Sequence, residues 1–219
     1  MNRFFRENGL SVVLLIITVL TLVGQTLVGW AVFNEELQEY GKPPLVLASY
    51  LTSGHYIEAV FENWESEFLQ MGLYVLLTVS LFQKGSSESK SLTESEEVDR
   101  EPQPTRKGAP WPVKRGGWIS KLYQNSLSLA YFLLFALSFW LHALGGLKEY
   151  NTEQTLKGKA EQLTLVEFMS SSDFWFQSLQ NWQSEFLSVL SIVVLSIFLR
   201  QKGSPQSKPV DASNDDTGE

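Results

Sequence analysis

Two long stretches without charged residues limit what this chain can fold into more than any other feature. Asp, Glu, Lys and Arg are absent from residues 10–33 and again from residues 122–147. At about 1.5 Å of rise per residue, a helix of either length crosses a hydrocarbon core roughly 30 Å thick. Both stretches are therefore predicted to be transmembrane helices, although the mean hydropathy of the whole chain is only -0.05.

The two halves of the sequence repeat each other. Residues 63–69 return with one change as residues 181–187, and residues 83–86 return as residues 201–204. An offset of 117 aligns the first apolar runs, and an offset of 118 aligns the later segments. So many identities in one register indicate a duplication. If each copy contributes two spans, both copies enter the membrane in the same orientation and are related by an axis along the membrane normal.

The second span of each copy has a short uncharged part. Residues 68–83 and 186–199 would cover only about 24 and 21 Å as helices, less than a hydrocarbon core. To cross the membrane, these helices should begin near Asn63 and Asn181. This start draws Glu67 and Glu185 into the membrane.

The predicted fold is an all-α integral membrane four-helix bundle of two tandem parallel repeats. Tyr56, Val60 and Trp64 follow helical spacing, which predicts a short amphipathic helix on the outer surface before the second span. The predicted organisation is a first repeat at 1–90 with spans at about 10–33 and 63–83, a largely disordered cytoplasmic linker at 91–121, a second repeat at 122–208 with spans at about 124–147 and 181–200, and a disordered acidic tail at 209–219.

Basic residues close to the spans all fall on one side if there are four spans. The positive-inside rule then places both termini and the linker in the cytoplasm. The linker also holds a basic cluster with two tryptophans, which fits either topology-setting charge with interfacial aromatics or a segment held at an anionic leaflet. The cluster consists of Arg106, Lys107, Trp111, Lys114, Arg115, Trp118 and Lys121.

Several polar groups within the predicted spans form a candidate intramembrane site. A carboxylate in a membrane is costly, so it should face the bundle and find a partner or become neutral. Counting residues along the helices places Gln25 at the depth of Glu67, and His142 at the depth of Glu185. Hydrogen bonds that fix helix register are one interpretation, and a proton or cation pathway is the other. The candidate residues are Glu67, Glu185, Gln25, His142, Asn63 and Asn181.

Three tryptophans are predicted to anchor the spans at the membrane interface, where indole rings are enriched. They are Trp30 at the end of the first span, and Trp64 and Trp182 at the entrances of the second and fourth.

The sequence argues against several classes of function. Cysteine is absent, and the two histidines, His55 and His142, lie on different segments, so neither a metal site nor another cofactor is expected. No phosphate-binding loop, nucleophile elbow or catalytic triad is recognisable, so the chain is not expected to be an enzyme. The net charge of -7 is spread over loops and tails, which argues against a nucleic-acid partner.

Residues 24–25, 29–30, 62–71 and 83–86 together resemble an uncharacterised family of small four-pass bacterial membrane proteins, catalogued as a domain of unknown function. The resemblance implies the bacterial inner membrane and supplies no activity. We expect a non-enzymatic structural or accessory membrane component, with the lipid bilayer and a second copy or another membrane protein as partners. The alternative is a small proton- or cation-coupled transporter or channel that uses Glu67 and Glu185, with His142 in the path.

Overall fold

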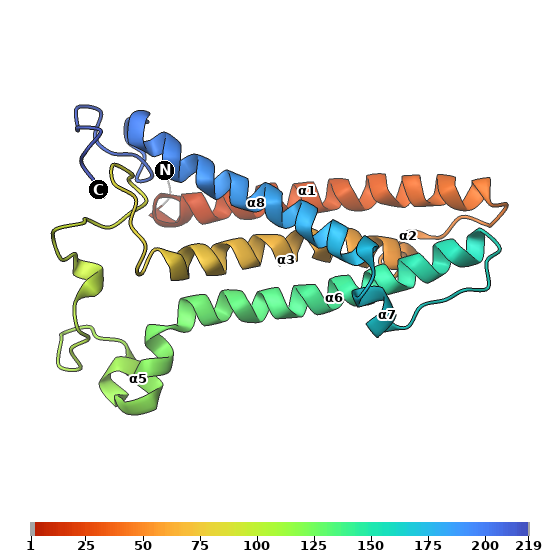
Figure 1. Ribbon diagram of the computed structural model, residues 1–219, viewed down its shortest axis with the longest axis horizontal. Coiled ribbons are helices and arrows are strands. Elements are labelled where there is room, and N and C mark those ends of the chain that lie inside the picture. The colour runs from red at the N-terminus through yellow and green to blue at the C-terminus, as the bar shows by residue number, and fades with distance from the viewer. Residues whose placement is uncertain (1–2, 219) are drawn as a thin grey trace. The chain divides into compact units, whose positions relative to one another are not determined.

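The computed structural model describes residues 3–218, and every regular element within them is helical. Figure 1 traces the helices in chain order. They are α1 (Arg3–Glu39), α2 (Leu47–Tyr50), α3 (Gly54–Leu77), the short 3-10 turn η1 (Glu97–Asp99), α4 (Trp111–Arg115), α5 (Gly117–Gln124), α6 (Ser126–Leu156), α7 (Leu165–Met169) and α8 (Ser172–Phe198). The predicted all-α class is therefore confirmed for the described residues.

Three of these helices are long and apolar enough to cross a membrane: α1, α6 and α8. Large apolar side chains stand on their surfaces, including Leu10 on α1 and Leu133 on α6, which are 76% and 71% exposed. Such surfaces are unfavourable in water and suit a lipid environment. The three helices suggest that the protein is associated with a membrane.

Helix α3 does not belong to this set, because four glutamates lie along it. They are Glu58, Glu62, Glu65 and Glu67. The helix also ends at Leu77, earlier than the predicted span end near residue 83. At this end the Thr78 hydroxyl donates to the carbonyls of Tyr74 and Val75, and the chain continues in tighter turns.

The prediction of a separate amphipathic helix before the second span is wrong. Residues 54–77 form one continuous helix, because nothing in the sequence near residue 63 interrupts the helical hydrogen bonds. The start of α3 is fixed by Ser53, whose hydroxyl accepts from the backbone N–H of Tyr56 at 3.1 Å. In the second half, Ser171 accepts from Phe174 at 3.3 Å, and α8 likewise begins at Ser172.

The described chain packs as two compact units. The first contains the residues up to Phe61 together with Trp140–Phe174, and the second contains Glu62–Phe139 and the residues from Trp175 on. The core of the first unit is built from Phe33, Leu37 and Tyr50, with further apolar side chains packed around them. Tyr50 can enter this core because Gly29 leaves room: a Cβ there would overlap the Tyr50 hydroxyl.

The same asparagine contact closes a loop in each half of the sequence. Asn34 accepts from the backbone N–H of Leu45 at 2.7 Å and donates to its carbonyl at 3.1 Å. Asn151 makes the same pair of bonds with Leu163, at 2.9 and 3.1 Å. Each asparagine therefore satisfies both backbone groups of one loop residue at the end of a long helix.

In the second unit, side chains of α3 and the segment that follows it bond to α8. The Gln70 amide donates to the carbonyl of Glu185 at 2.8 Å and to the Ser188 hydroxyl at 3.0 Å. Beyond the end of α3, the hydroxyls of Ser86 and Ser196 lie 2.9 Å apart. These bonds fix the register of α3 and its C-terminal extension against α8.

The C-terminal segment makes specific contacts in the second unit, and the disorder predicted for residues 209–219 stays a prediction. The Lys208 ammonium is 2% exposed and donates to the carbonyls of Ser213, Asn214 and Asp216 at 2.8–3.3 Å. The Thr217 hydroxyl accepts from the backbone N–H of Gly85 at 2.9 Å. Three backbone carbonyls thus replace the water around one buried cation.

Candidate functional site

The strongest candidate site lies in the second unit, where the carboxyl groups of Glu67 and Glu185 lie close enough to interact and both line one groove. Glu67 is carried by α3 and Glu185 by α8. Glu67 is exposed and Glu185 is half-buried. Two carboxyl groups can share a hydrogen bond only when one of them carries a proton, because an ionised carboxylate has no donor. The arrangement can therefore hold a proton between two helices.

A groove of about 420 Å³ contains this pair. We call it the acidic groove, and it is lined by Glu67, Gln70, Met71, Tyr74, Glu88, Glu185, Ser188, Val189, Ile192 and Gln206. Gln70 and Ser188, which bond to each other, are the polar neighbours of the pair on the two helices. The pair can thus exchange protons or ions with water or solutes that enter the groove.

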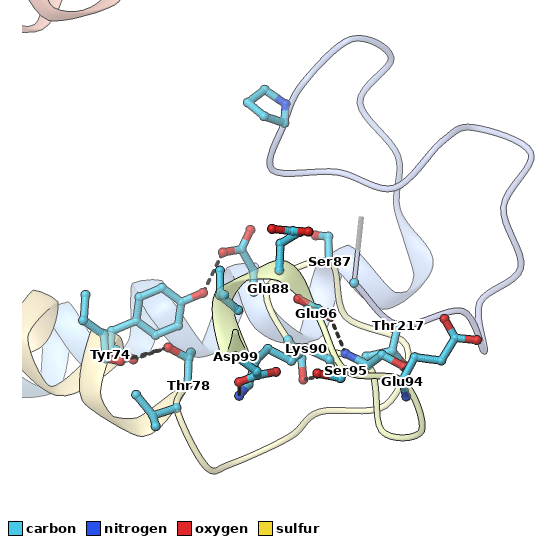
Figure 2. Close-up of a pocket in the computed structure, with 18 of the residues that line it drawn as sticks. Tyr74, Thr78, Ser87, Glu88, Lys90, Glu94, Ser95, Glu96, Asp99 and Thr217 are labelled. Carbon is cyan, nitrogen blue, oxygen red and sulfur yellow. Dashed lines mark hydrogen bonds and ion pairs between the residues drawn. The ribbon is translucent and has the colours of Figure 1, made fainter. Parts of the chain in front are cut away.

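The acidic groove adjoins a larger cavity of about 990 Å³ (Figure 2). Tyr74, Glu88 and Gln206 line both hollows. In Figure 2 the Tyr74 hydroxyl points at Glu88, to which it donates at 2.6 Å. These two side chains form a hydrogen-bonded connection between the groove and the cavity.

Glu88 was not among the residues predicted from the sequence, because it lies in a serine-rich segment that resembles a linker. A signal for structure was present, however. The backbone N–H of Gln83 donates to the Ser89 hydroxyl at 2.9 Å, and that of Gln201 donates to Ser207 at 2.8 Å. The similarity between the halves extends through these serines, so the segment around Glu88 has a repeated local structure.

Gln25 and His142 lie in the first unit and have partners other than the glutamate pair. The Gln25 amide donates to the carbonyl of Ala59 at 3.2 Å. His142 is fully buried, and its ring stacks on Phe174 with 4.8 Å between centroids. A ring nitrogen of His142 also lies within 4.8 Å of a carboxylate oxygen of Glu58. Imidazole and carboxylate groups are both common metal ligands and proton carriers. These two neighbouring groups could therefore bind a metal ion or pass a proton.

The two asparagines stand next to the pair along their helices. The Asn181 amide donates to the backbone carbonyl of Gln177 at 3.1 Å, and the Asn63 carbonyl accepts from the Ser66 hydroxyl at 2.7 Å. These bonds lie within one helix each and stabilise the helical turns that precede Glu67 and Glu185.

The three tryptophans differ in their surroundings. The Trp30 indole donates to the carbonyl of Leu45 at 2.7 Å, and that of Trp182 donates to Glu65 at 3.2 Å. Trp64 is 39% exposed and has its ring against Phe68. The indole N–H groups of Trp30 and Trp182 are thus engaged within the protein, and anchoring at the membrane interface stays a prediction.

His55 and Tyr50 form a second titratable pair, in the first unit. The Tyr50 hydroxyl and the His55 Nδ1 lie 3.0 Å apart. Burial, followed by the nearby Tyr56 and Glu149, raises the pKa of Tyr50 to about 12, so the hydroxyl keeps its proton at neutral pH. Burial lowers the pKa of His55 below its ordinary value of 6.5.

The lowered pKa of His55 predicts acid sensitivity. The unfolded chain binds a proton at His55 more readily than the folded chain, so this contribution to stability is complete above pH 6.5 and is lost as the pH falls through the lower folded-state pKa. Thermal unfolding in detergent, measured at a series of pH values, should show a stability difference between the wild type and His55→Gln that shrinks with acidification. A difference that is constant across this pH range would contradict the assignment.

The helices and the site together define a class: an all-helical protein with apolar, membrane-spanning-length helices and an acidic groove between α3 and α8 of the second unit. The chain belongs to the family described as Domain of unknown function (DUF6766), which it matches over residues 1–219. The resemblance to an uncharacterised family is thereby confirmed. No curated protein and no solved structure matches the chain.

Proposed function

We propose that this chain is a non-enzymatic four-span membrane protein that moves protons or small cations through a site centred on Glu67 and Glu185. The observation that carries the proposal is the placement of these two carboxyl groups, one from α3 and one from α8, in a single open groove. Ionisable residues are rare in membrane segments and often mark ion or proton pathways. A pair that shares one proton can release it and take it up again without ionising both groups at once.

The proposed path leaves the pair through Tyr74 and Glu88. Tyr74 lies in the groove between the pair and the larger cavity, and its 2.6 Å bond to Glu88 supplies a donor and an acceptor in line. The cavity beyond is lined by further carboxylates, including Glu94 and Glu96. Negative charge at the mouth of a path raises the local concentration of cations.

The proposed topology has four spans in two parallel repeats, with both termini in the cytoplasm of a bacterial inner membrane. Helices α1, α6 and α8 supply three spans, and α3 supplies the fourth if its glutamates face the acidic groove and protein rather than lipid. The paired loop contacts of Asn34 and Asn151 support an internal repeat. The inner-membrane assignment rests on the family resemblance.

A structural or accessory role is the second candidate, and one observation favours it. The glutamate pair lies in a series of polar contacts that bond α3 and its extension to α8, including Gln70 with Ser188, Glu65 with Trp182 and Ser86 with Ser196. Polar contacts of this kind hold transmembrane helices together. In that case the shared proton would fix helix register and would not move.

Flux measurements separate the two candidates. The purified chain would be reconstituted into vesicles that contain a dye sensitive to protons, Na⁺ or K⁺, and an imposed gradient of the matching ion would be followed in time. We expect faster dissipation of at least one gradient than in protein-free vesicles. Rates equal to those of protein-free vesicles for all three cations would contradict transport and favour the accessory role.

Topology can be tested separately, because the chain contains no cysteine. Single cysteines replacing Lys42 and Ser95 would be labelled in inverted and right-side-out vesicles with a membrane-impermeant reagent. The four-span proposal expects labelling from opposite sides. Labelling of both positions from the same side would exclude it.

A further inference from the structure

The segment before α6 carries the strongest run of positive charge in the chain. Arg106, Lys107, Lys114, Arg115 and Lys121 lie close together, and no Asp or Glu occurs from Pro102 to Lys148. The whole chain has a net charge of -7. Within residues 3–218, none of these five basic side chains forms an ion pair with a carboxylate. Their charge is therefore available to an outside partner.

The structure gives this segment a definite shape, formed by α4 and α5. We call residues 106–124 the basic elbow. Gly116 and Gly117, with φ of 70° and 60°, join the two short helices in a conformation that side chains with a Cβ rarely adopt. Each helix carries an exposed tryptophan in its first turn and basic residues about one turn later: Trp111 precedes Lys114 and Arg115, and Trp118 precedes Lys121.

The aromatic side chains and one leucine of the basic elbow are exposed. Trp111 and Trp118 are 65% and 73% exposed, and Leu122 and Tyr123 are 52% and 43% exposed. Indole rings beside lysine and arginine suit the headgroup region of a bilayer, where the ring enters the boundary layer and the cation meets a phosphate. A single residue, Asn125, separates α5 from α6, which is a helix of membrane-spanning length, so the elbow stands next to a candidate membrane span.

From these observations we propose that the basic elbow binds the surface of an anionic phospholipid bilayer. Charge selects the lipid: five unpaired basic residues favour a negatively charged leaflet over a zwitterionic one. The exposed indoles supply the apolar part of the contact. The Gly116–Gly117 turn sets the angle between α4 and α5, and so the position of one tryptophan relative to the other.

The test uses the full chain in lipid nanodiscs, with Val113→Cys carrying an environment-sensitive dye on α4. We expect its emission to shift to the blue as phosphatidylglycerol replaces phosphatidylcholine. The shift should be reversed near 1 M salt, where the screening length is about 3 Å. Neutralising Lys114 and Lys121 by glutamine should lower the equilibrium constant for binding to the anionic surface by about fivefold for each charge removed, so a higher phosphatidylglycerol fraction is needed for half of the shift.

The matched control neutralises Lys42 and Lys159, two exposed lysines outside the basic elbow, and should leave the half-maximal fraction unchanged. An equal shift in pure phosphatidylcholine would overturn the charge selectivity. A shift already present in detergent micelles would mean that another segment of the protein covers the elbow, and this would overturn the proposal. So would the absence of a shift at every lipid composition.

Discussion

Replacing both Glu67 and Glu185 by glutamine is expected to reduce the cation or proton flux of reconstituted vesicles to the background of protein-free vesicles. Glutamine has nearly the shape of glutamic acid and can still hydrogen-bond across the two helices, but it cannot release a proton or attract a cation. The substitution thus removes the proposed chemistry and preserves the contact between α3 and α8. The measurement is the initial rate of gradient dissipation at matched protein content.

The control for this variant replaces two exposed carboxylates outside the acidic groove, Glu35 and Glu39. Glu35→Gln with Glu39→Gln changes the net charge equally and should retain the wild-type rate. Thermal unfolding of the Glu67→Gln, Glu185→Gln protein should stay close to the wild type. Wild-type flux in the Glu67→Gln, Glu185→Gln protein would refute the site and would place the path elsewhere in the chain.

The second large effect is expected at Gly145, where α6 meets the start of α3 in the first unit. A Cβ at Gly145 would lie 2.5 Å from the backbone nitrogen of Glu58 and 2.8 Å from the Ile57 side chain. Backbone cannot rotate away as a side chain can, so the helices must separate. Gly145→Ala should cost about 1–3 kcal/mol, as overpacked cores do, which corresponds to a fall of roughly 2–10 °C in the unfolding temperature.

Gly24 on α1 provides the matched control, because nothing lies within 4 Å of the position that a Cβ would take. Gly24→Ala should leave the unfolding temperature unchanged or raise it, since alanine is favoured over glycine in a helix interior by up to about 1 kcal/mol. Equal effects of the two substitutions would show that helix propensity, and not the close approach of α3 and α6, determines the result.

The sequence was sufficient to predict the apolar helices α1 and α6, whereas the choice of Glu67 and Glu185 as site residues stays a prediction. Residues 10–33 and 122–147 fall largely within α1 and α6. The length and the absence of charge of a segment are enough to predict a helix that crosses a bilayer, because the hydrocarbon core sets both requirements. Glu67 and Glu185 were singled out because the uncharged segments that follow them are too short to cross a membrane as helices. That reasoning depends only on helical rise.

The residues that Gln25 and His142 contact could not be predicted in the same way. Counting the helical rise per residue placed Gln25 at the depth of Glu67 and His142 at the depth of Glu185. This count gives the position of a residue along the helix axis but not the direction in which its side chain points. Gln25 bonds to Ala59, and His142 stacks on Phe174. Both contacts involve residues at the start of α3 or α8, which the sequence assigned to a separate surface helix.

The two walls of the acidic groove are chemically unequal in a way that gives the site a polarity. Glu88 in the first half corresponds, at the offset of 118, to Gln206 in the second, and both line the acidic groove. This difference places an acid on one side of the groove and an amide of nearly equal size on the other. A duplicated protein with two identical halves would hold a cation equally from either side. Because the carboxylate of Glu88 faces the amide of Gln206 across this groove, we expect a cation there to rest closer to the segment that follows α3.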